Sequence, residues 1–135
     1  MMVYLVEDAP VIRERLRDMI MELDHNTQVY EATTAVEAIA GIVEKQPELV
    51  VLDLKLEQGN GLDVLRVVKE KMPASRVVVF TNQASQPYRK KCMAMGATDF
   101  FDKTQDFAKL RDMVRKTNST TKASTDNGEK NEHNE

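Results

Sequence analysis

Short apolar runs alternate along the chain with longer segments whose apolar residues recur at helical spacing. The runs at 49–52 and 77–80 are continuously apolar and rich in β-branched residues, which is typical of strands covered on both faces. All five runs lie at 3–6, 29–30, 49–52, 77–80 and 100–101. Each run is followed by a helical stripe, and the stripes begin at Ile12, Ala35, Leu62, Tyr88 and Phe107.

This alternation predicts an α/β domain with a parallel sheet and helices on both faces. Right-handed crossovers leave few topologies, and we favour a flavodoxin-like, doubly wound (βα)5 fold with strand order 2-1-3-4-5. Thr34 and Glu37 predict a capping box before the second helix, and Gly96 is expected to end the fourth. The domain is predicted to span residues 1–117. Residues 118–135 hold almost no apolar side chains, so we expect a disordered polar tail.

Composition excludes several classes of protein. The 135 residues carry 19 basic and 22 acidic side chains, a net charge of -3, which argues against a nucleic-acid surface. No helix-turn-helix pattern follows residue 117, so we expect no direct DNA binding. The apolar runs are too short to span a membrane. Cys92 is the single cysteine and no secretory signal is visible, which together favour a cytoplasmic location.

Polar residues follow four of the predicted strands. Carboxyl ends of parallel strands meet at one edge of such a sheet. The residues concerned are Glu7 and Asp8, Asp53, Thr81 and Asn82, and Lys103. Any one of them alone would more commonly cap a helix or form a turn, but their succession at four strand ends favours a site.

The chemistry of these residue types indicates phosphoryl transfer. Three converging carboxylates repel one another unless a cation lies between them, and hard oxygen ligands suit Mg²⁺ or Mn²⁺. A lysine and a hydroxyl beside a carboxylate supply what the oxygens of a phosphoryl group require. The sequence therefore suggests a carboxylate nucleophile that accepts a phosphoryl group.

With these motifs in this order, residues 2–117 resemble a receiver domain of bacterial two-component response regulators, in particular the single-domain, chemotaxis-regulator type. The loop at 59–63 and the segment 96–103 add to the resemblance. The resemblance implies that Asp53 accepts the phosphoryl group from a sensor histidine kinase or a histidine phosphotransfer protein. It also implies a metal site, with Glu7 acting through water and the direct ligands being Asp8, Asp53 and the backbone carbonyl of Lys55.

The resemblance further implies that Thr81 and Lys103 contact the phosphoryl oxygens and that Phe100 is the aromatic residue that rotates on activation. Asn82 stands where the family often has a small residue, so we expect its side chain to crowd the phosphoryl site. Output would pass through the face formed by the fourth helix, fifth strand and fifth helix. The family forms both monomers and homodimers through these elements.

We therefore predict a stand-alone receiver that signals to a protein partner or relays the phosphoryl group, and that is no enzyme beyond its own phosphorylation and dephosphorylation. Two alternatives stay open, namely a receiver-like interaction module that is never phosphorylated and the receiver fragment of a longer regulator. A hydrolase of the haloacid-dehalogenase type is disfavoured because Lys55 occupies the position of its second aspartate.

Overall fold

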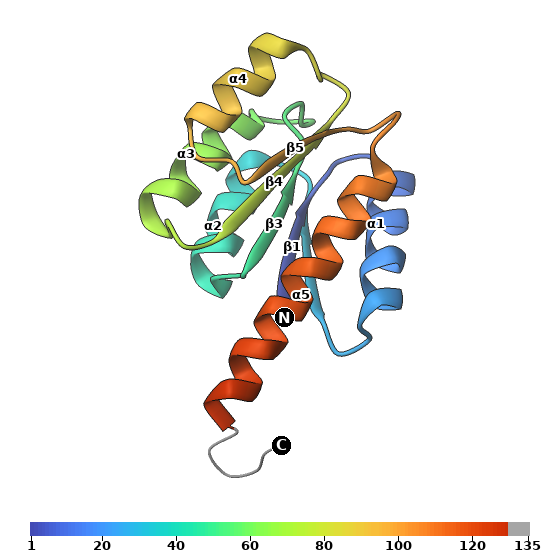
Figure 1. The fold of residues 1–135 in the computed structure, drawn as a ribbon. Coiled ribbons are helices and arrows are strands. Elements are labelled where there is room, and N and C mark those ends of the chain that lie inside the picture. Colours follow the sequence, from blue (N-terminus) through green and yellow to red (C-terminus); the bar gives the residue numbers. More distant parts are fainter. Residues whose placement is uncertain (130–135) are drawn as a thin grey trace.

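The computed structural model describes residues 1–129, and the side chains of residues 1–119. Five parallel strands form one sheet in the order β2-β1-β3-β4-β5, which confirms the predicted doubly wound fold (Figure 1). The strands are β1 (Met2–Val6), β2 (Gln28–Ala32), β3 (Leu49–Leu52), β4 (Arg76–Thr81) and β5 (Asp99–Asp102). Every residue of β3 is buried, as the continuous apolar run predicted.

Five helices cover the two faces of this sheet (Figure 1). Their bounds are α1 (Pro10–Leu23), α2 (Ala35–Lys45), α3 (Gly61–Lys71), α4 (Gln86–Ala94) and α5 (Phe107–Glu129). Alternate residues of β1 face opposite layers. Val3 and Leu5 pack in the cluster that contains residues of α1 and α5, whereas Tyr4 and Val6 pack with those of α2, α3 and α4.

Local signals set the helix ends. The Thr34 hydroxyl accepts a hydrogen bond from the Glu37 amide at 3.2 Å, and the Glu37 carboxylate accepts one from the Thr33 amide at 2.9 Å. The predicted cap of α2 is therefore present, with the return bond going to the residue before Thr34. Gly96, at φ +104°, follows the end of α4 in the left-handed conformation that a glycine adopts without steric cost.

The last helix is longer than the sequence predicted. We expected a disordered polar tail from residue 118, but α5 continues to Glu129, and Thr117 and Asn118 are buried. The apolar pattern ends near residue 117, yet a helix that is already formed gains one backbone hydrogen bond for each residue added. Residues 130–135 of the predicted tail lie outside the described residues. No helix within residues 1–129 is both long and apolar enough to cross a membrane.

Candidate functional site

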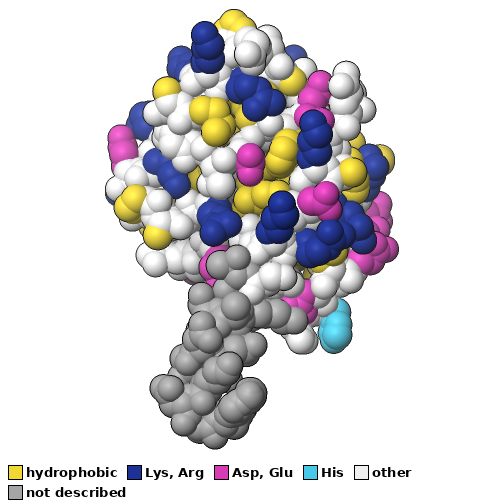
Figure 2. Space-filling view, in the orientation of Figure 1, with side chains coloured by type: hydrophobic (Ala, Val, Ile, Leu, Met, Phe, Trp, Pro, Cys, Tyr) yellow, Lys and Arg dark blue, Asp and Glu magenta, His cyan; other side chains and the backbone are white. Residues whose placement is uncertain are grey.

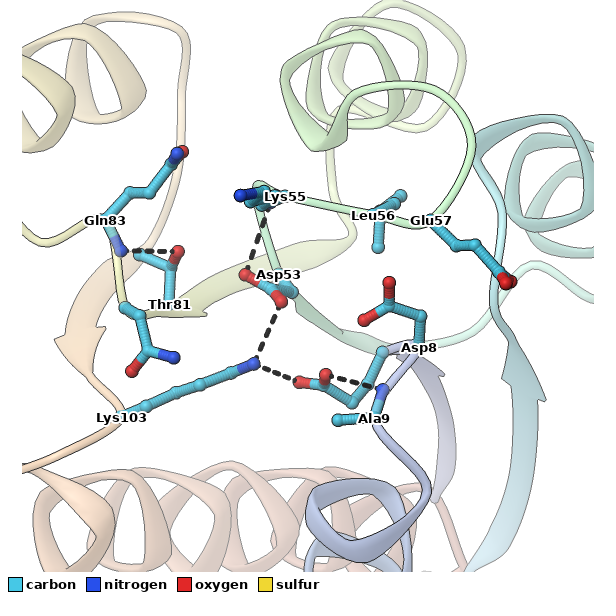
Figure 3. Close-up of a pocket in the computed structure, with 11 residues that line it drawn as sticks. Asp8, Ala9, Asp53, Lys55, Leu56, Glu57, Thr81, Gln83 and Lys103 are labelled. Atoms are coloured by element: carbon cyan, nitrogen blue, oxygen red, sulfur yellow. Dashed lines mark hydrogen bonds and ion pairs between the residues drawn. The ribbon is translucent and has the colours of Figure 1, made fainter.

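A cavity of about 460 Å³ lies at the edge of the sheet where the strands end (Figure 3). The loops after β1, β3, β4 and β5 supply its walls. Seven of the residues that the sequence pointed to line it, namely Glu7, Asp8, Asp53, Lys55, Thr81, Asn82 and Lys103. The structure thus brings together groups that lie up to 96 residues apart in the chain, between positions 7 and 103.

Three carboxylates form the acidic part of this cavity. One oxygen of each of Glu7, Asp8 and Asp53 lies within 4.8 Å of the others. Glu7 and Asp53 are buried, at 2% and 6% exposure, so water screens their charges poorly. Burial raises the pKa of Glu7 above its ordinary value, against the lowering effect of hydrogen bonds from Lys103 and the Ala9 amide.

Lys103 lies between two of these carboxylates. Its Nζ is 2.8 Å from Glu7 Oε1 and 2.9 Å from Asp53 Oδ2, and its side chain is buried (Figure 3). Burial lowers the pKa of Lys103, but hydrogen bonds to Glu7 and Asp53 together with their charges outweigh this effect and raise it. The ammonium group therefore stays charged and balances part of the negative charge of the cavity.

The turn after β5 holds Lys103 in place. The Lys103 amide donates to the Thr81 carbonyl at 3.1 Å, which extends the pairing of β4 and β5 by one residue. The Asp102 carboxylate accepts hydrogen bonds from both the amide and the hydroxyl of Thr104, and these bonds lower the pKa of Asp102. Thr104 thus closes this turn, and α5 begins three residues later at Phe107.

Asp53 is fixed by the backbone on both sides. Its amide donates to the Val6 carbonyl at 3.0 Å, and its carboxylate accepts from the Lys55 amide at 3.3 Å. Lys55 in turn pairs with Asn60 in an isolated antiparallel bridge, which closes the loop between β3 and α3. Gly61 lies against this loop so tightly that a methyl group there would overlap the Asp53 carbonyl oxygen.

Thr81 is fully buried at the end of β4, and its hydroxyl accepts a hydrogen bond from the Gln83 amide at 3.0 Å. Asn82 and Gln83 both line the cavity. Gln83 was not predicted from the sequence because it stands in a loop with no pattern of its own. Its position two residues after the Thr81 hydroxyl was the available signal.

Phe100 lies apart from the other predicted site residues. It is 1% exposed and belongs to the core on the α2, α3 and α4 side of the sheet, and it does not line the cavity. The Arg89 side chain of α4 donates to the Phe100 carbonyl at 3.1 Å, and its guanidinium carbon lies 5.0 Å from the centre of the ring. Any movement of Phe100 is therefore coupled to α4.

The acidic cluster fits a hard divalent cation. Lys103 pairs with Glu7 and Asp53, but no ion pair to Asp8 is found among residues 1–119. Clustered carboxylate oxygens are ligands that Mg²⁺ and Mn²⁺ prefer. The cavity can hold an anionic group with Asp53, Lys103 and the Thr81 hydroxyl around it, because cations then offset the repulsion.

Comparison with known proteins agrees with this geometry. A family model described as response regulator receiver domain matches residues 3–115. The photosynthetic apparatus regulatory protein RegA of Rhodobacter capsulatus is 33% identical over 102 residues, which cover 76% of this chain and 54% of RegA. The chain thus spans about half the length of this curated relative.

Solved structures show the same fold. A two-component response regulator of the LuxR family from Aurantimonas sp. SI85-9A1 aligns with a TM-score of 0.73 at 32% identity, covering 81% of this chain and 78% of that one. The receiver domain of sensor histidine kinase PA1611 from Pseudomonas aeruginosa PAO1, described with magnesium in its active-site cleft, aligns with a TM-score of 0.73 at 20% identity. That alignment covers 85% of this chain and 94% of the other.

Proposed function

Because the chain belongs to the family of response regulator receiver domains, we propose that it accepts a phosphoryl group on Asp53 and transmits that state to another molecule. The observation that carries the proposal is the position of the Asp53 carboxylate. It directly follows β3, lies in the cavity and has one oxygen 2.9 Å from the Lys103 Nζ. Glu7 shares this ammonium at 2.8 Å, and Asp8 completes the cluster of three carboxylates beside it.

The transfer step needs one nucleophile and charge neutralisation. An Asp53 oxygen attacks the phosphorus of a phosphohistidine, so an O–P bond forms, the N–P bond breaks and the imidazole leaves with the electron pair and takes up a proton. Lys103 stabilises the negative charge on the phosphoryl oxygens. The Thr81 hydroxyl donates a hydrogen bond to one of them, and Asn82 limits the space beside the group.

A divalent cation completes the proposed site. Asp8, Asp53 and the Lys55 carbonyl would bind Mg²⁺ or Mn²⁺ directly, and Glu7 would act through a water molecule. When bound, the cation neutralises charge on the phosphoryl oxygens. The three clustered carboxylates and the magnesium named for the PA1611 receiver domain support this assignment.

The phosphoryl donor is proposed to be a sensor histidine kinase or a histidine phosphotransfer protein, and the output a protein contact through α4, β5 and α5. Figure 2 shows Lys and Arg side chains interspersed with apolar ones on the face that carries α4 and α5. Lys90, Lys91 and Met93 are exposed on α4, which suits a partner with acidic and apolar groups. We also propose that a second copy of this chain can bind the same elements and form a homodimer.

We propose that the protein has no separate substrate to turn over, acts in the cytoplasm and does not contact DNA through the described residues. A second candidate is the receiver part of a longer regulator. The extra length of RegA favours it, since that relative is nearly twice as long as the matched part. Phosphorylation of Asp53 is common to both candidates.

Mass spectrometry tests the proposal. We expect incubation with Mg²⁺ and a small phosphodonor, phosphoramidate, to add one phosphoryl group to the wild-type protein and none to Asp53→Asn. Asp99→Asn is the matched control, because Asp99 lies on β5 away from the cavity, and it should be modified like the wild type. Lack of modification of the wild type by both phosphoramidate and a phosphorylated histidine phosphotransfer protein would contradict the proposal and favour an unphosphorylated interaction module.

A further inference from the structure

An arginine on α1 contacts the backbone of Glu7, which together with Asp8 forms the acidic pair that follows β1. Arg13 Nη1 donates a hydrogen bond of 2.9 Å to the backbone carbonyl of Glu7, and Arg13 Nε donates one of 3.1 Å to Glu31 Oε1. The two contacts use different nitrogens of one planar guanidinium, so they fix its orientation. Arg13 therefore ties α1 both to strand β2, which carries Glu31, and to the loop that carries Glu7.

A second arginine completes this network without touching the site. Arg17, one turn further along α1, places its Nε 2.6 Å from the other oxygen of Glu31. Both carboxylate oxygens of Glu31 are thus occupied. Among residues 1–119, Arg17 makes no hydrogen bond or ion pair with the loop after β1. A comparison of Arg13 with Arg17 therefore separates the role of the loop contact from that of charge on α1.

The carbonyl that Arg13 holds lies where regular pairing stops. The ladder between β1 and β2 ends at Val6 and Ala32, and the Glu7 amide makes the last bond of that ladder. Beyond this point the Glu7 carboxylate is bonded to the Ala9 amide and to Lys103. The direction of the Glu7 and Asp8 side chains thus depends on the backbone of residues 7–9, which Arg13 anchors from outside the cavity.

We propose that Arg13 is a positioning residue for the metal site, since it orients the acidic pair through the Glu7 carbonyl while Glu31 orients Arg13. This inference rests on the proposed function, in which Glu7 and Asp8 bind the cation. Partners of metal ligands commonly change metal affinity by about 10- to 100-fold when they are removed. Because Arg13 acts through the backbone of Glu7, we expect an effect near the lower end of that range.

Charge alone predicts the opposite change in metal affinity when Arg13 is removed. Arg13 is a cation near a site for a divalent cation, so its removal would tighten metal binding if charge alone mattered. Loss of positioning weakens binding instead. The sign of the change therefore separates the two explanations.

Direct Mn²⁺ binding to the full chain tests this inference without any phosphoryl transfer. The dissociation constant is measured from the electron paramagnetic resonance signal of free Mn²⁺ for the wild type, Arg13→Ala, Arg13→Lys and Arg17→Ala. We expect Arg13→Ala to bind Mn²⁺ about tenfold more weakly than the wild type. Arg17→Ala removes the same charge from the same network and should bind as the wild type does or more tightly.

Arg13→Lys keeps the charge but presents a single point donor that cannot serve Glu7 and Glu31 together. We expect it to remain at least threefold weaker than the wild type, in the direction of Arg13→Ala. Thermal unfolding without metal identifies any variant that has lost its fold, and the lysine variant, which keeps an ion pair with Glu31, guards against that outcome for alanine.

The experiment distinguishes a failure of this inference from a failure of the proposed function. Unchanged or tighter Mn²⁺ binding by folded Arg13→Ala, with normal binding by the wild type, overturns the role of Arg13 alone. Absence of Mn²⁺ binding by the wild type overturns the metal site, and with it both the proposed function in its metal-dependent form and this inference.

Discussion

At the scale of single residues, Lys103 is the cation that offsets the negative charge of the buried Glu7 and Asp53 carboxylates. Replacing it with methionine leaves Glu7 and Asp53 buried beside each other without their ammonium partner. Breaking a buried pair in this way costs about 3 kcal/mol of unfolding free energy. We expect Lys103→Met to lose about this much in urea unfolding at pH 8 without metal, and to regain part of it when Mg²⁺ is added.

The same variant has a defined pH dependence. Burial already raises the pKa of Glu7, so the folded state takes up a proton at a pH where the unfolded chain has lost it. Stability then falls as pH rises through the interval between the ordinary and the raised pKa of Glu7. The destabilisation of Lys103→Met should therefore shrink as pH is lowered from 8 to 5. Lys109→Met is the control, because the Lys109 side chain is largely exposed where it meets Asp106, and it should change stability by less than about 0.5 kcal/mol at any of these pH values. An equal loss in both variants would contradict this account.

At the scale of elements, the loop between β3 and α3 and the first residue of α3 set the position of Asp53. Alanine at position 61 would place a methyl group against the Asp53 carbonyl oxygen and 2.7 Å from the Leu54 Cα, both of which are backbone atoms that cannot rotate away. We expect Gly61→Ala to lose about 2 kcal/mol of unfolding free energy and to bind Mn²⁺ more weakly, because the backbone of Asp53 must shift. Urea unfolding and Mn²⁺ titration measure the two effects.

Asn60→Ala is the matched control for that variant. Its side chain caps α3 by accepting from the Leu62 amide at 2.7 Å, so its loss should cost about 1 kcal/mol. Asn60 does not line the cavity, and its bridge to Lys55 is made by backbone atoms that alanine retains, so Mn²⁺ affinity should stay at the wild-type value. If Gly61→Ala also kept that affinity, the close contact would be a matter of packing alone.

The strands differ in how clearly the sequence predicts their bounds. Central strands are visible in the sequence because both faces are buried, and the run 49–52 matches β3 residue for residue. The edge strands are longer than their apolar runs. Sequence pointed to 29–30 and 100–101, whereas β2 covers Gln28–Ala32 and β5 covers Asp99–Asp102. Apart from Ala32, the residues outside these runs are polar and are held by ladder hydrogen bonds to β1 and β4, which leave no hydrophobic signal.

The residues of the candidate site also differ in whether the sequence could predict them. Glu7, Asp8, Asp53 and Lys103 could be predicted because each stands within two residues of the end of a strand, and topology alone brings strand ends together. Arg13 could not, because its role depends on the side-chain path from one helix to a carbonyl of another element. The burial of Phe100 against Arg89 depends likewise on how α4 packs, which no local pattern encodes.

At the scale of the whole molecule, strand order explains why one cavity contains all these groups. β1 lies between β2 and β3, so the acidic pair at its end adjoins Asp53, and β4 follows on the other side of β3. Lys103 then reaches Asp53 across the end of β4 although 50 residues separate them in sequence. The contacts that join the separate loops of the cavity to one another are thus long-range, and the cavity depends on the complete sheet and on the two layers that cover it.

α5 supports this arrangement through residues of its first half. The α5 residues in the core beside β1, β3 and β4 are Leu110, Met113 and Val114, and the last buried residue described is Asn118. A chain ending at Ser119 retains all of them. We expect its urea unfolding free energy to stay within about 1 kcal/mol of the full chain and its Mn²⁺ affinity to be unchanged.

A chain ending at Lys109 loses three core side chains, each worth about 2 kcal/mol or more, and should be unfolded without denaturant. A large loss of stability in the chain ending at Ser119 would show that residues 120–135 contribute to the fold, and that the segment predicted from its polarity to be a tail is a structural part of the domain.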